Sequence, residues 1–379
     1  MPMLRTQLPI PSVGLLIPVA MVFGLGAIKI FSTGKLHILT NVAAHFYFIL
    51  LLFVYLLSSS FWNPFDVSTG DATLKIFLIL ITAVSVIISL NSRGAYHFVN
   101  WIIFFAVFAA FTLFLEYIRL GNFSGYRLSD TLVRPQLMGL GTIFSVSKLL
   151  FFRETGEKRY MVITGFLLFG LAFGGARGAL LLSFGICMII LGYYFYMVNP
   201  KSYSLQQWFK NKSLRIFSIA SVIIVITAAL QIERTANKMR RLFFGGELLY
   251  GERADLWASS FLSYLDSPVI GFGLRSSGLL SYEQESYYPH NMFLEVMLDG
   301  GIIALIILLI ICIYPIVRAV ELYRKDRLKN MIWLPLMAGY IFLIFEFSKS
   351  SMIYDGRILF SMGLILLIAV EYVKNESKG

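Results

Sequence analysis

Charged residues are scarce in this chain, and so are the residue types that build most disulfide scaffolds and metal centres. Only 14% of the 379 residues are Asp, Glu, Lys or Arg, whereas about a quarter is usual in a soluble protein. The two cysteines, Cys187 and Cys312, lie in separate apolar runs, and the four histidines show no ligand spacing. The sequence therefore argues against a disulfide framework, a metal site and an ordinary soluble domain.

Apolar sequence is what the chain has in abundance. Hydrophobic residues make up 58% and aromatic residues 16%, with a mean hydropathy of +0.76. A membrane-crossing helix needs about 20 mainly apolar residues. Eleven stretches qualify: 13–31, 38–61, 72–90, 98–118, 131–151, 159–175, 178–198, 214–231, 293–316, 331–347 and 355–373. Prolines and glycines in 8–31 leave open a short hairpin there, which would give twelve. The sequence predicts an all-α polytopic integral membrane protein of about 11–12 transmembrane helices, a single membrane domain over 1–379 with its first apolar segment retained.

The basic loops predict the orientation of this domain. Lysine and arginine gather in 152–160, 199–215, 317–330 and the C-terminal tail, and alternation of the spans puts all four on one side. Such loops are typically cytoplasmic. The net charge of +11 then reflects topology, and we expect no nucleic acid partner. One large loop, 231–292, is predicted on the opposite, outer side.

The opposite side of the membrane is rich in arginine and poor in lysine. Its arginines are Arg119, Arg127, Arg134, Arg177, Arg234, Arg240, Arg241, Arg253, Arg275 and Arg357. A guanidinium group binds phosphate oxygens in pairs, so one interpretation is a phosphate-bearing ligand. The other is general contact with anionic lipid headgroups.

Two of these arginines lie in distinctive surroundings. Arg177 stands among small residues at the outer boundary of two apolar runs, where it is either functional or a side chain that reaches to the interface. Arg253 precedes Trp257 on a predicted amphipathic helix whose apolar positions 257, 261, 262 and 265 share one face. That helix is expected to lie on the membrane or to cap the bundle. Arg253 either follows that face inward or pairs with Glu252 or Asp255.

His290 is the one histidine of the large loop and is a candidate general base for a sugar hydroxyl. The alternative is a structural role at the start of the next helix, where Pro289 and Asn291 fit a helix N-terminus. The stretch from Asp266 to Arg275 is turn-rich, its Gly-x-Gly is interpreted as loop geometry, and Arg275 is expected to be exposed.

Glu116 and Glu346 are acids that lie inside predicted spans. Paired buried acids are compatible with proton coupling in a transporter. Since both lie near span ends, pairing with Arg119 or Lys349 is the simpler interpretation.

Three segments together resemble the bacterial O-antigen ligase/polymerase superfamily. Gly-Ala-Arg177-Gly-Ala-Leu is similar to the arginine motif that opens an outer-facing helix in that family, and Arg253-Ala-Asp-Leu-Trp257 is similar to the arginine motif of its large periplasmic loop. His290-Asn291 with Gly301 eleven positions on resembles its His-Asn signature, which departs here at Ala304, where Gly, Thr or Tyr is usual.

The resemblance implies transfer of a glycan from an undecaprenyl-diphosphate donor to an acceptor sugar hydroxyl at the periplasmic face of the bacterial inner membrane, with no metal or other cofactor. Arg177 and Arg253 would hold the diphosphate, His290 would activate the hydroxyl, and Asn291 and Arg275 are further candidates for substrate contact. The acceptor is a lipid-linked repeat unit in a polymerase and lipid A-core in a ligase. A protein acceptor is a third option, and a chain-length regulator is a candidate partner.

O-antigen polymerase is the leading hypothesis, and O-antigen ligase is the alternative within the family. A transporter or flippase for lipid-linked sugars is the alternative from another class. It would predict inverted repeats or broken helices, and the sequence shows neither sign.

Overall fold

The computed structural model describes residues 40–65, 69–90, 92–120, 133–151, 157–173, 177–198, 252–282, 289–325 and 333–376. The predicted spans 13–31 and 214–231, and residues 231–251 of the large loop, lie outside these residues. Within the described residues the regular structure is entirely helical. Four helical segments there are long and apolar enough to cross a membrane: Thr40–Trp62, Gly70–Ser89, Gly94–Glu116 and Met292–Leu322. The all-α polytopic membrane fold is therefore confirmed.

Each of the nine predicted spans within the described residues corresponds to a helix. They are α2 (Thr40–Ser58), α3 (Gly70–Ser89), α4 (Ser92–Leu120), α5 (Val133–Phe151), α6 (Glu157–Phe173), α7 (Arg177–Val198), α13 (Met292–Lys325), α14 (Trp333–Ser350) and α15 (Arg357–Glu376). Two short 3-10 turns, η1 (Ser59–Trp62) and η3 (Ile353–Asp355), follow α2 and α14. The large loop contributes α11 (Glu252–Tyr264) and α12 (Ser276–Tyr282).

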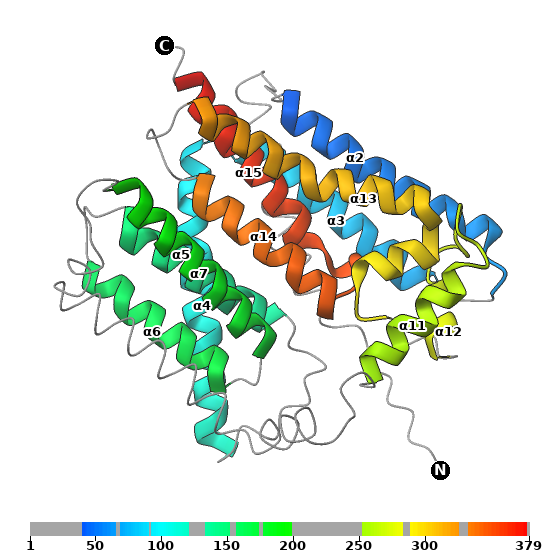
Figure 1. Cartoon of the computed structure of the whole chain (residues 1–379), viewed down its shortest axis with the longest axis horizontal. Helices are drawn as coiled ribbons and strands as arrows, with labels where there is room; N and C mark the ends of the chain where they lie inside the picture. Colours follow the sequence, from blue (N-terminus) through cyan, green and yellow to red (C-terminus); the bar gives the residue numbers. More distant parts are fainter. Residues whose placement is uncertain are drawn as a thin grey trace.

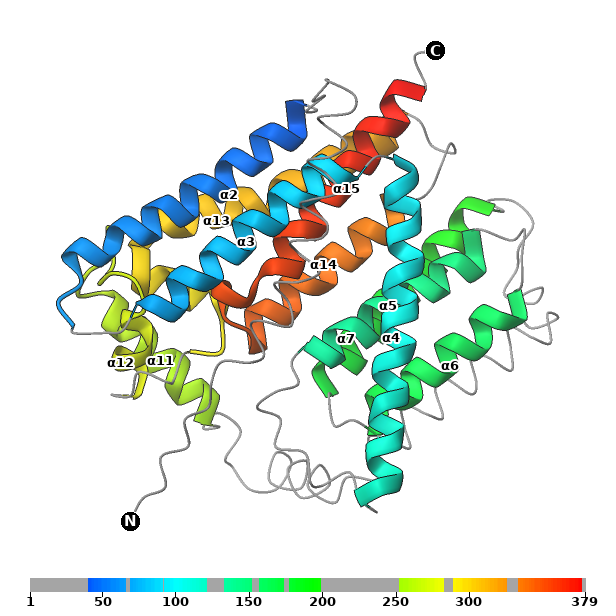
Figure 2. The ribbon, with the colours of Figure 1, turned by 180° about the vertical axis from the view of Figure 1, so that it is seen from behind.

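The long helices form two packed groups (Figures 1 and 2). In one, α2, α3, α13 and α14 surround α15; in the other, α4, α6 and α7 surround α5. Both central helices are almost wholly buried, which explains why α5 carries small and hydroxyl side chains, such as Gly139 and Ser145, that allow close approach.

Two glycine–phenylalanine contacts join the groups through α5 and α14. A Cβ placed on Gly139 would lie 2.2 Å from the ring of Phe342, and one on Gly339 would lie 2.8 Å from the ring of Phe144. Each ring therefore occupies the space that a larger residue would fill on the facing helix. This reciprocal fit fixes the position of α14 relative to α5.

One end of the bundle carries the starts of α3, α5, α7, α13 and α15 and the ends of α2, α4, α6 and α14, and we call it the His290 face. Interhelical contacts establish it: Arg134 pairs with Glu116, and Nε2 of Gln136 donates to Oγ of Ser351 at 2.8 Å. α11 and α12 pack at the same end (Figure 1). The arrangement agrees with the alternation expected from the basic loops.

Helix α13 is broken, which the sequence did not predict. Gly301 adopts φ 65° and ψ −164° within it. A Cβ at this position would lie 2.2 Å from the carbonyl oxygen of Val269, so glycine is required both for the left-handed φ and for the close approach. The break is filled by backbone bonds: Ile302 N–H donates to Pro268 O, and Phe272 N–H donates to Leu298 O, both at 2.8 Å.

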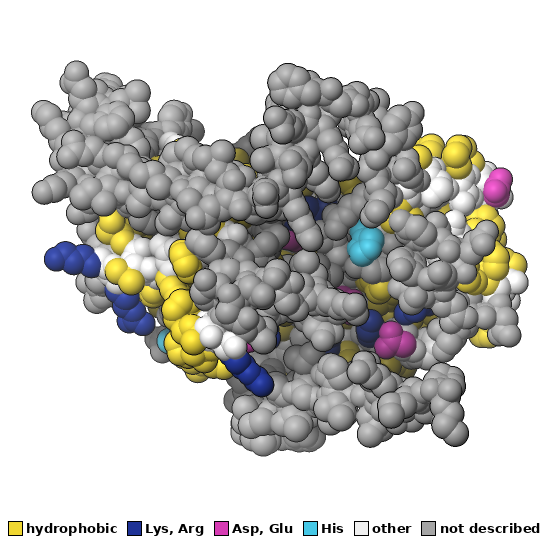
Figure 3. Space-filling view, turned by 90° about the horizontal axis from the view of Figure 1, so that it is seen from below, with side chains coloured by type: hydrophobic (Ala, Val, Ile, Leu, Met, Phe, Trp, Pro, Cys, Tyr) yellow, Lys and Arg dark blue, Asp and Glu magenta, His cyan; other side chains and the backbone are white. Residues whose placement is uncertain are grey.

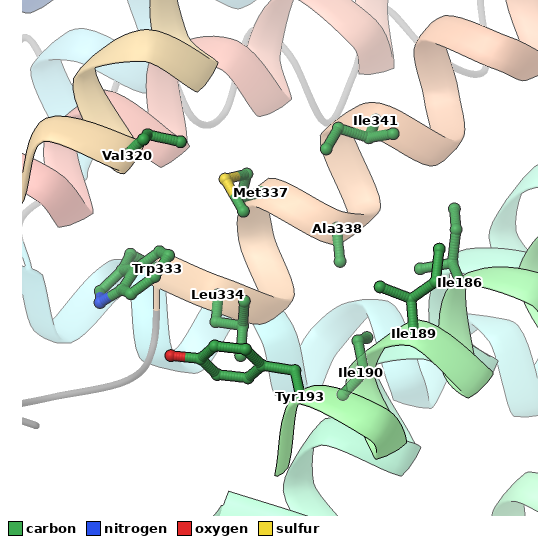
Figure 4. Close-up of a pocket in the computed structure, with 10 residues that line it drawn as sticks. All are labelled: Ile186, Ile189, Ile190, Tyr193, Val320, Trp333, Leu334, Met337, Ala338 and Ile341. Atoms are coloured by element: carbon green, nitrogen blue, oxygen red, sulfur yellow. The ribbon is translucent and has the colours of Figure 1, made fainter. Parts of the chain in front are cut away.

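An apolar cavity of about 280 Å³ lies away from the His290 face, between α7, α14 and the last part of α13 (Figure 4). Its lining includes Ile189 and Tyr193 of α7 and Trp333 and Met337 of α14. The cavity presents only apolar surface, which suits hydrocarbon and offers no group for chemistry.

Candidate active site

His290 is the first of the two residues immediately before α13, and its backbone conformation is uncommon for a residue other than glycine. Its φ is 52° and its side chain is partly buried. The following residue, Asn291, caps the helix, because its Oδ1 accepts the N–H groups of Phe293 at 3.0 Å and Leu294 at 3.3 Å. The residue that caps α13 is therefore Asn291, and this bond accounts for the asparagine of the His-Asn pair.

The peptide that precedes His290 is held from a different helix. The indole N–H of Trp257 in α11 donates to the carbonyl oxygen of Pro289 at 2.9 Å. His290 thus lies between two anchors, the Trp257 bond on one side and the Asn291 cap on the other. The two bonds fix the backbone from which the imidazole projects.

Arg275 has the same unusual backbone geometry at the start of α12. Its φ is 68°, and the two preceding glycines, Gly271 and Gly273, also have positive φ, which confirms loop geometry for the Gly-x-Gly. The expectation that Arg275 is exposed was wrong: its side chain is 18% exposed and its guanidinium lies 3.4 Å from Oδ2 of Asp71. The turn directs the arginine back onto the start of α3.

Arg275 and His290 are the two non-glycine residues with positive φ among the described residues. Such conformations cost free energy and persist where the surrounding contacts impose them, commonly at functional sites. The sequence named His290 as a candidate general base, and Arg275 was a candidate for substrate contact. Their positive φ angles are independent structural evidence that points to the same two residues.

Asp299, two residues before the break in α13, connects these segments. It is fully buried and accepts the backbone N–H of Arg275 at 3.1 Å, the N–H of Ser277 at 2.9 Å and the hydroxyl of Ser276 at 3.2 Å. The hydroxyl of Tyr354 in η3 donates to its Oδ2. One carboxylate therefore ties α12 and η3 to α13, the helix that follows His290.

Glu295, one turn earlier in α13, is a second buried acid that binds the same corner. It is 1% exposed, and its Oε2 accepts the backbone N–H of Ile353 at 2.7 Å.

The Tyr354 hydroxyl, which donates to Asp299, has a shifted pKa. Burial is the largest cause and the nearby Asp299 carboxylate the next, and together they raise the pKa of Tyr354 well above its ordinary value. The phenol consequently stays protonated and keeps its role as a donor.

Glu295, Asp299 and Tyr354 were not predicted from the sequence. Glu295 and Asp299 lie inside the predicted span 293–316. An ionisable residue inside a span is a candidate for a functional role, and this reason, which singled out Glu116 and Glu346, applied to them equally. Tyr354 carried no comparable signal, because its role depends on a contact with a residue 55 positions away.

Arg177 is the first residue of α7, as the resemblance implied, although the predicted span began at residue 178, and its neighbour Gly178 lies against Lys349 of α14. A Cβ on Gly178 would lie 2.0 Å from Nζ of Lys349. Glycine here gives room for the ammonium group beside the first turn of α7. The side chains of Arg177 and Arg253 lie outside the described part of the structure, which places only their backbones, at the starts of α7 and α11.

The corner after α14 bridges the start of α7 and the start of α13. Lys349 contacts Gly178, and four residues later Ile353 bonds to Glu295. Both ribbon views show the end of α14 between α7 and α11 (Figures 1 and 2). The corner thus connects the Arg177 motif with the His290 motif.

Glu116 and Glu346, the two acids that the sequence singled out inside predicted spans, each form an ion pair. Glu346 forms an ion pair with Lys349 at 2.7 Å, which confirms the simpler interpretation. Glu116 pairs at 2.9 Å with Arg134 rather than with Arg119 or Lys349. Because α4 and α5 run side by side, the partner of Glu116 comes from α5 and not from the end of α4.

The His290 face mixes both signs of charge. Lys75 lies 3.3 Å from Asp71 and 3.2 Å from Asp355, and Asp71 also meets Arg275. Figure 3 shows a histidine side chain near the middle of the face seen from below, with basic and acidic side chains close to it. A partly exposed base among fixed charges is an arrangement that suits proton transfer to or from a bound polar substrate.

Comparison with known proteins assigns a family to this segment. Residues 160–309 match the family model described as Wzy_C, O-antigen ligase. No curated protein matches the chain. The matched residues run from α6 to the broken part of α13 and include Arg177, Arg253, Arg275, His290 and Asn291. This part of a membrane protein is therefore similar to the O-antigen ligase/polymerase superfamily.

Proposed function

We propose that the protein transfers a glycan from undecaprenyl diphosphate to the hydroxyl of an acceptor sugar at the periplasmic face of the inner membrane, as an O-antigen polymerase. The observation that carries the proposal is the coincidence of chemistry and strain at His290: the one described histidine on the His290 face has φ 52° and is anchored on both sides. Preorganised groups of this kind are typical of catalytic positions.

In the proposed reaction, His290 accepts the proton of the acceptor hydroxyl as the oxygen bonds to the anomeric carbon of the donor. The bond from that carbon to the diphosphate oxygen breaks, and undecaprenyl diphosphate leaves with the electron pair. Arg177 and Arg253 stabilise the negative charge that develops on the diphosphate, an effect that is strong in a site poor in water. No metal or other cofactor is assigned a role.

The surroundings of Arg177 support its part in this proposal. The amino end of α7 carries the positive end of a 22-residue helix dipole, and the ammonium of Lys349 lies against the same turn. The pairing of Arg275 with Asp71 supports a positioning role for that arginine, whose backbone also bonds to Asp299. The cap formed by Asn291 supports positioning of His290 in the same way.

The break in α13 weakens one argument against a transporter, since broken helices occur in transporters. Here, however, loop 268–273 bonds to the groups freed by the break. The backbone groups at the break are thus hydrogen-bonded to another part of the protein and are not left for a substrate or an ion. This favours a structural role for the break. The transferase remains the function we propose.

The experiment is a surface-polysaccharide gel of a strain that lacks the gene, complemented with wild type, His290→Ala or Arg177→Lys. A single repeat unit on lipid A-core in the deletion strain identifies a polymerase. Loss of all surface glycan with accumulation of lipid-linked polymer identifies the alternative, a ligase. We expect both variants to behave like the deletion. An unchanged ladder in the deletion strain would contradict the transferase proposal for that glycan.

A further inference from the structure

The outward face of α11 is apolar, whereas the outward face of a surface helix in a soluble protein is polar. Among its described side chains, 256–264, the exposed ones are Trp257, Ala258, Phe261 and Leu262, all apolar. Ser260 is fully buried, and the other polar side chains are only partly exposed. The sequence had placed Trp257, Phe261 and Leu262 on one face, and the structure turns that face away from the bundle.

The apolar surface continues into the turn that follows α11. Leu265, Val269 and Ile270 are 54%, 57% and 44% exposed. Asp266 is the only charged residue between 256 and 274. We call the exposed residues of α11 together with this turn the α11 patch: Trp257, Ala258, Phe261, Leu262, Leu265, Val269 and Ile270. A patch of this extent is unusual on a surface that faces water.

The turn lies at the depth of a membrane span. Pro268 O accepts the N–H of Ile302, and Val269 O lies against Gly301. Both helix residues belong to the apolar segment Met292–Leu322. From Ile302 onward this span exposes large apolar side chains, with Ile303 38% and Ile306 51% exposed. The turn of the α11 patch therefore lies next to the stretch of α13 that exposes large apolar side chains.

We propose that the α11 patch is embedded in the bilayer leaflet at the His290 face, with its side chains at the boundary between headgroups and hydrocarbon. Its partner is lipid, because the patch is continuous with the lipid-facing side of α13, has no basic residue, and exposes apolar rather than polar side chains. Trp257 is suited to this boundary, since an indole has an apolar body and a polar N–H, and here that N–H is bonded to Pro289 O.

As a consequence, the lipid leaflet fixes the position of the His290 segment along the membrane normal. Trp257 contacts lipid on one side and the peptide before His290 on the other. The inference goes beyond the proposed reaction, since contact with lipid requires no chemistry at His290.

The test uses the full chain reconstituted in vesicles of phosphatidylethanolamine and phosphatidylglycerol. Spin labels are attached to Leu262→Cys or Val269→Cys, with Ile306→Cys as the lipid-facing reference. Cys187 and Cys312 are buried and free, and the unsubstituted chain measures any background label. Collision with oxygen, which concentrates in lipid, is compared with collision with a water-soluble nickel chelate.

We expect the labels at 262 and 269 to show the oxygen preference of the label at 306. A nickel preference at both positions would overturn the proposal. Strong dipolar coupling between labels on two copies of the chain would also overturn it, because the patch would then be covered by a second copy. Neither result depends on transfer activity, so failure here is distinct from failure of the proposed function.

Discussion

The backbone N–H of Ile353 donates to Oε2 of Glu295 at 2.7 Å, which joins the corner after α14 to the first turn of α13. Both partners are buried. Four residues further along α13, Asp299 receives the hydroxyl of Tyr354 from the same corner. Two acids on successive turns of α13 thus hold one 3-10 turn against the helix that follows the proposed base, His290.

Glu295→Leu should destabilise the protein more than Glu295→Gln. Leucine leaves the buried N–H of Ile353 without an acceptor, which costs about 1–3 kcal/mol, whereas the glutamine oxygen can still accept it. Thermal unfolding in detergent compares the two variants. Equal unfolding temperatures for both would show that the Ile353 bond contributes nothing to stability.

Gly301→Ala should impair folding and transfer together. Alanine would have to adopt φ 65° and place its Cβ 2.2 Å from Val269 O, which is backbone and cannot move aside cheaply. The matched control is Gly185→Ala in α7, where nothing lies within 4 Å of the added Cβ. That control should be neutral or stabilising by up to about 1 kcal/mol. Limited proteolysis and expression level measure both variants, and a Gly301→Ala protein as resistant as the control would contradict the description of the break.

Asn291→Ala should weaken the start of α13 while Asn291→Asp should not. Loss of the cap to Phe293 and Leu294 costs about 1 kcal/mol, and an aspartate oxygen replaces the acceptor. We expect lower transfer activity for the alanine variant, with activity close to wild type for the aspartate variant. If aspartate fails as badly as alanine, the amide contacts substrate, and the cap is not its main role.

Trp257→Phe should slow transfer without preventing donor binding. It removes the hydrogen bond to Pro289, worth about 1 kcal/mol, which corresponds to roughly a fivefold change in rate if the bond positions His290. The control is Phe261→Leu, on the exposed face of the same helix. Rates at saturating donor distinguish positioning from binding, and equal rates for both variants would remove the Trp257 bond from the proposed site.

Periodicity and hydropathy were enough to predict the nine long helices within the described residues, because a membrane span can be recognised in about 20 contiguous apolar residues. They could not reveal the break at Gly301, whose cause is the carbonyl of Val269, 32 positions earlier. For the same reason Arg275 was expected in solvent: its partner Asp71 comes from another helix. His290 and Arg177 were identifiable from composition and flanking residues, whereas the Glu295–Asp299–Tyr354 connections arise only when distant segments meet.

The central claim is that His290 is the proton acceptor, and in vitro transfer by the purified protein in vesicles tests it most directly. Undecaprenyl-diphosphate-linked repeat units serve as donor and acceptor, and the variants are His290→Ala and His290→Asn. Asparagine tolerates positive φ better than most residues, so it separates loss of the imidazole from backbone strain. We predict that both variants bind the donor as wild type does and form no polymer. Polymer formation at a rate near wild type by the folded asparagine variant would contradict the claim.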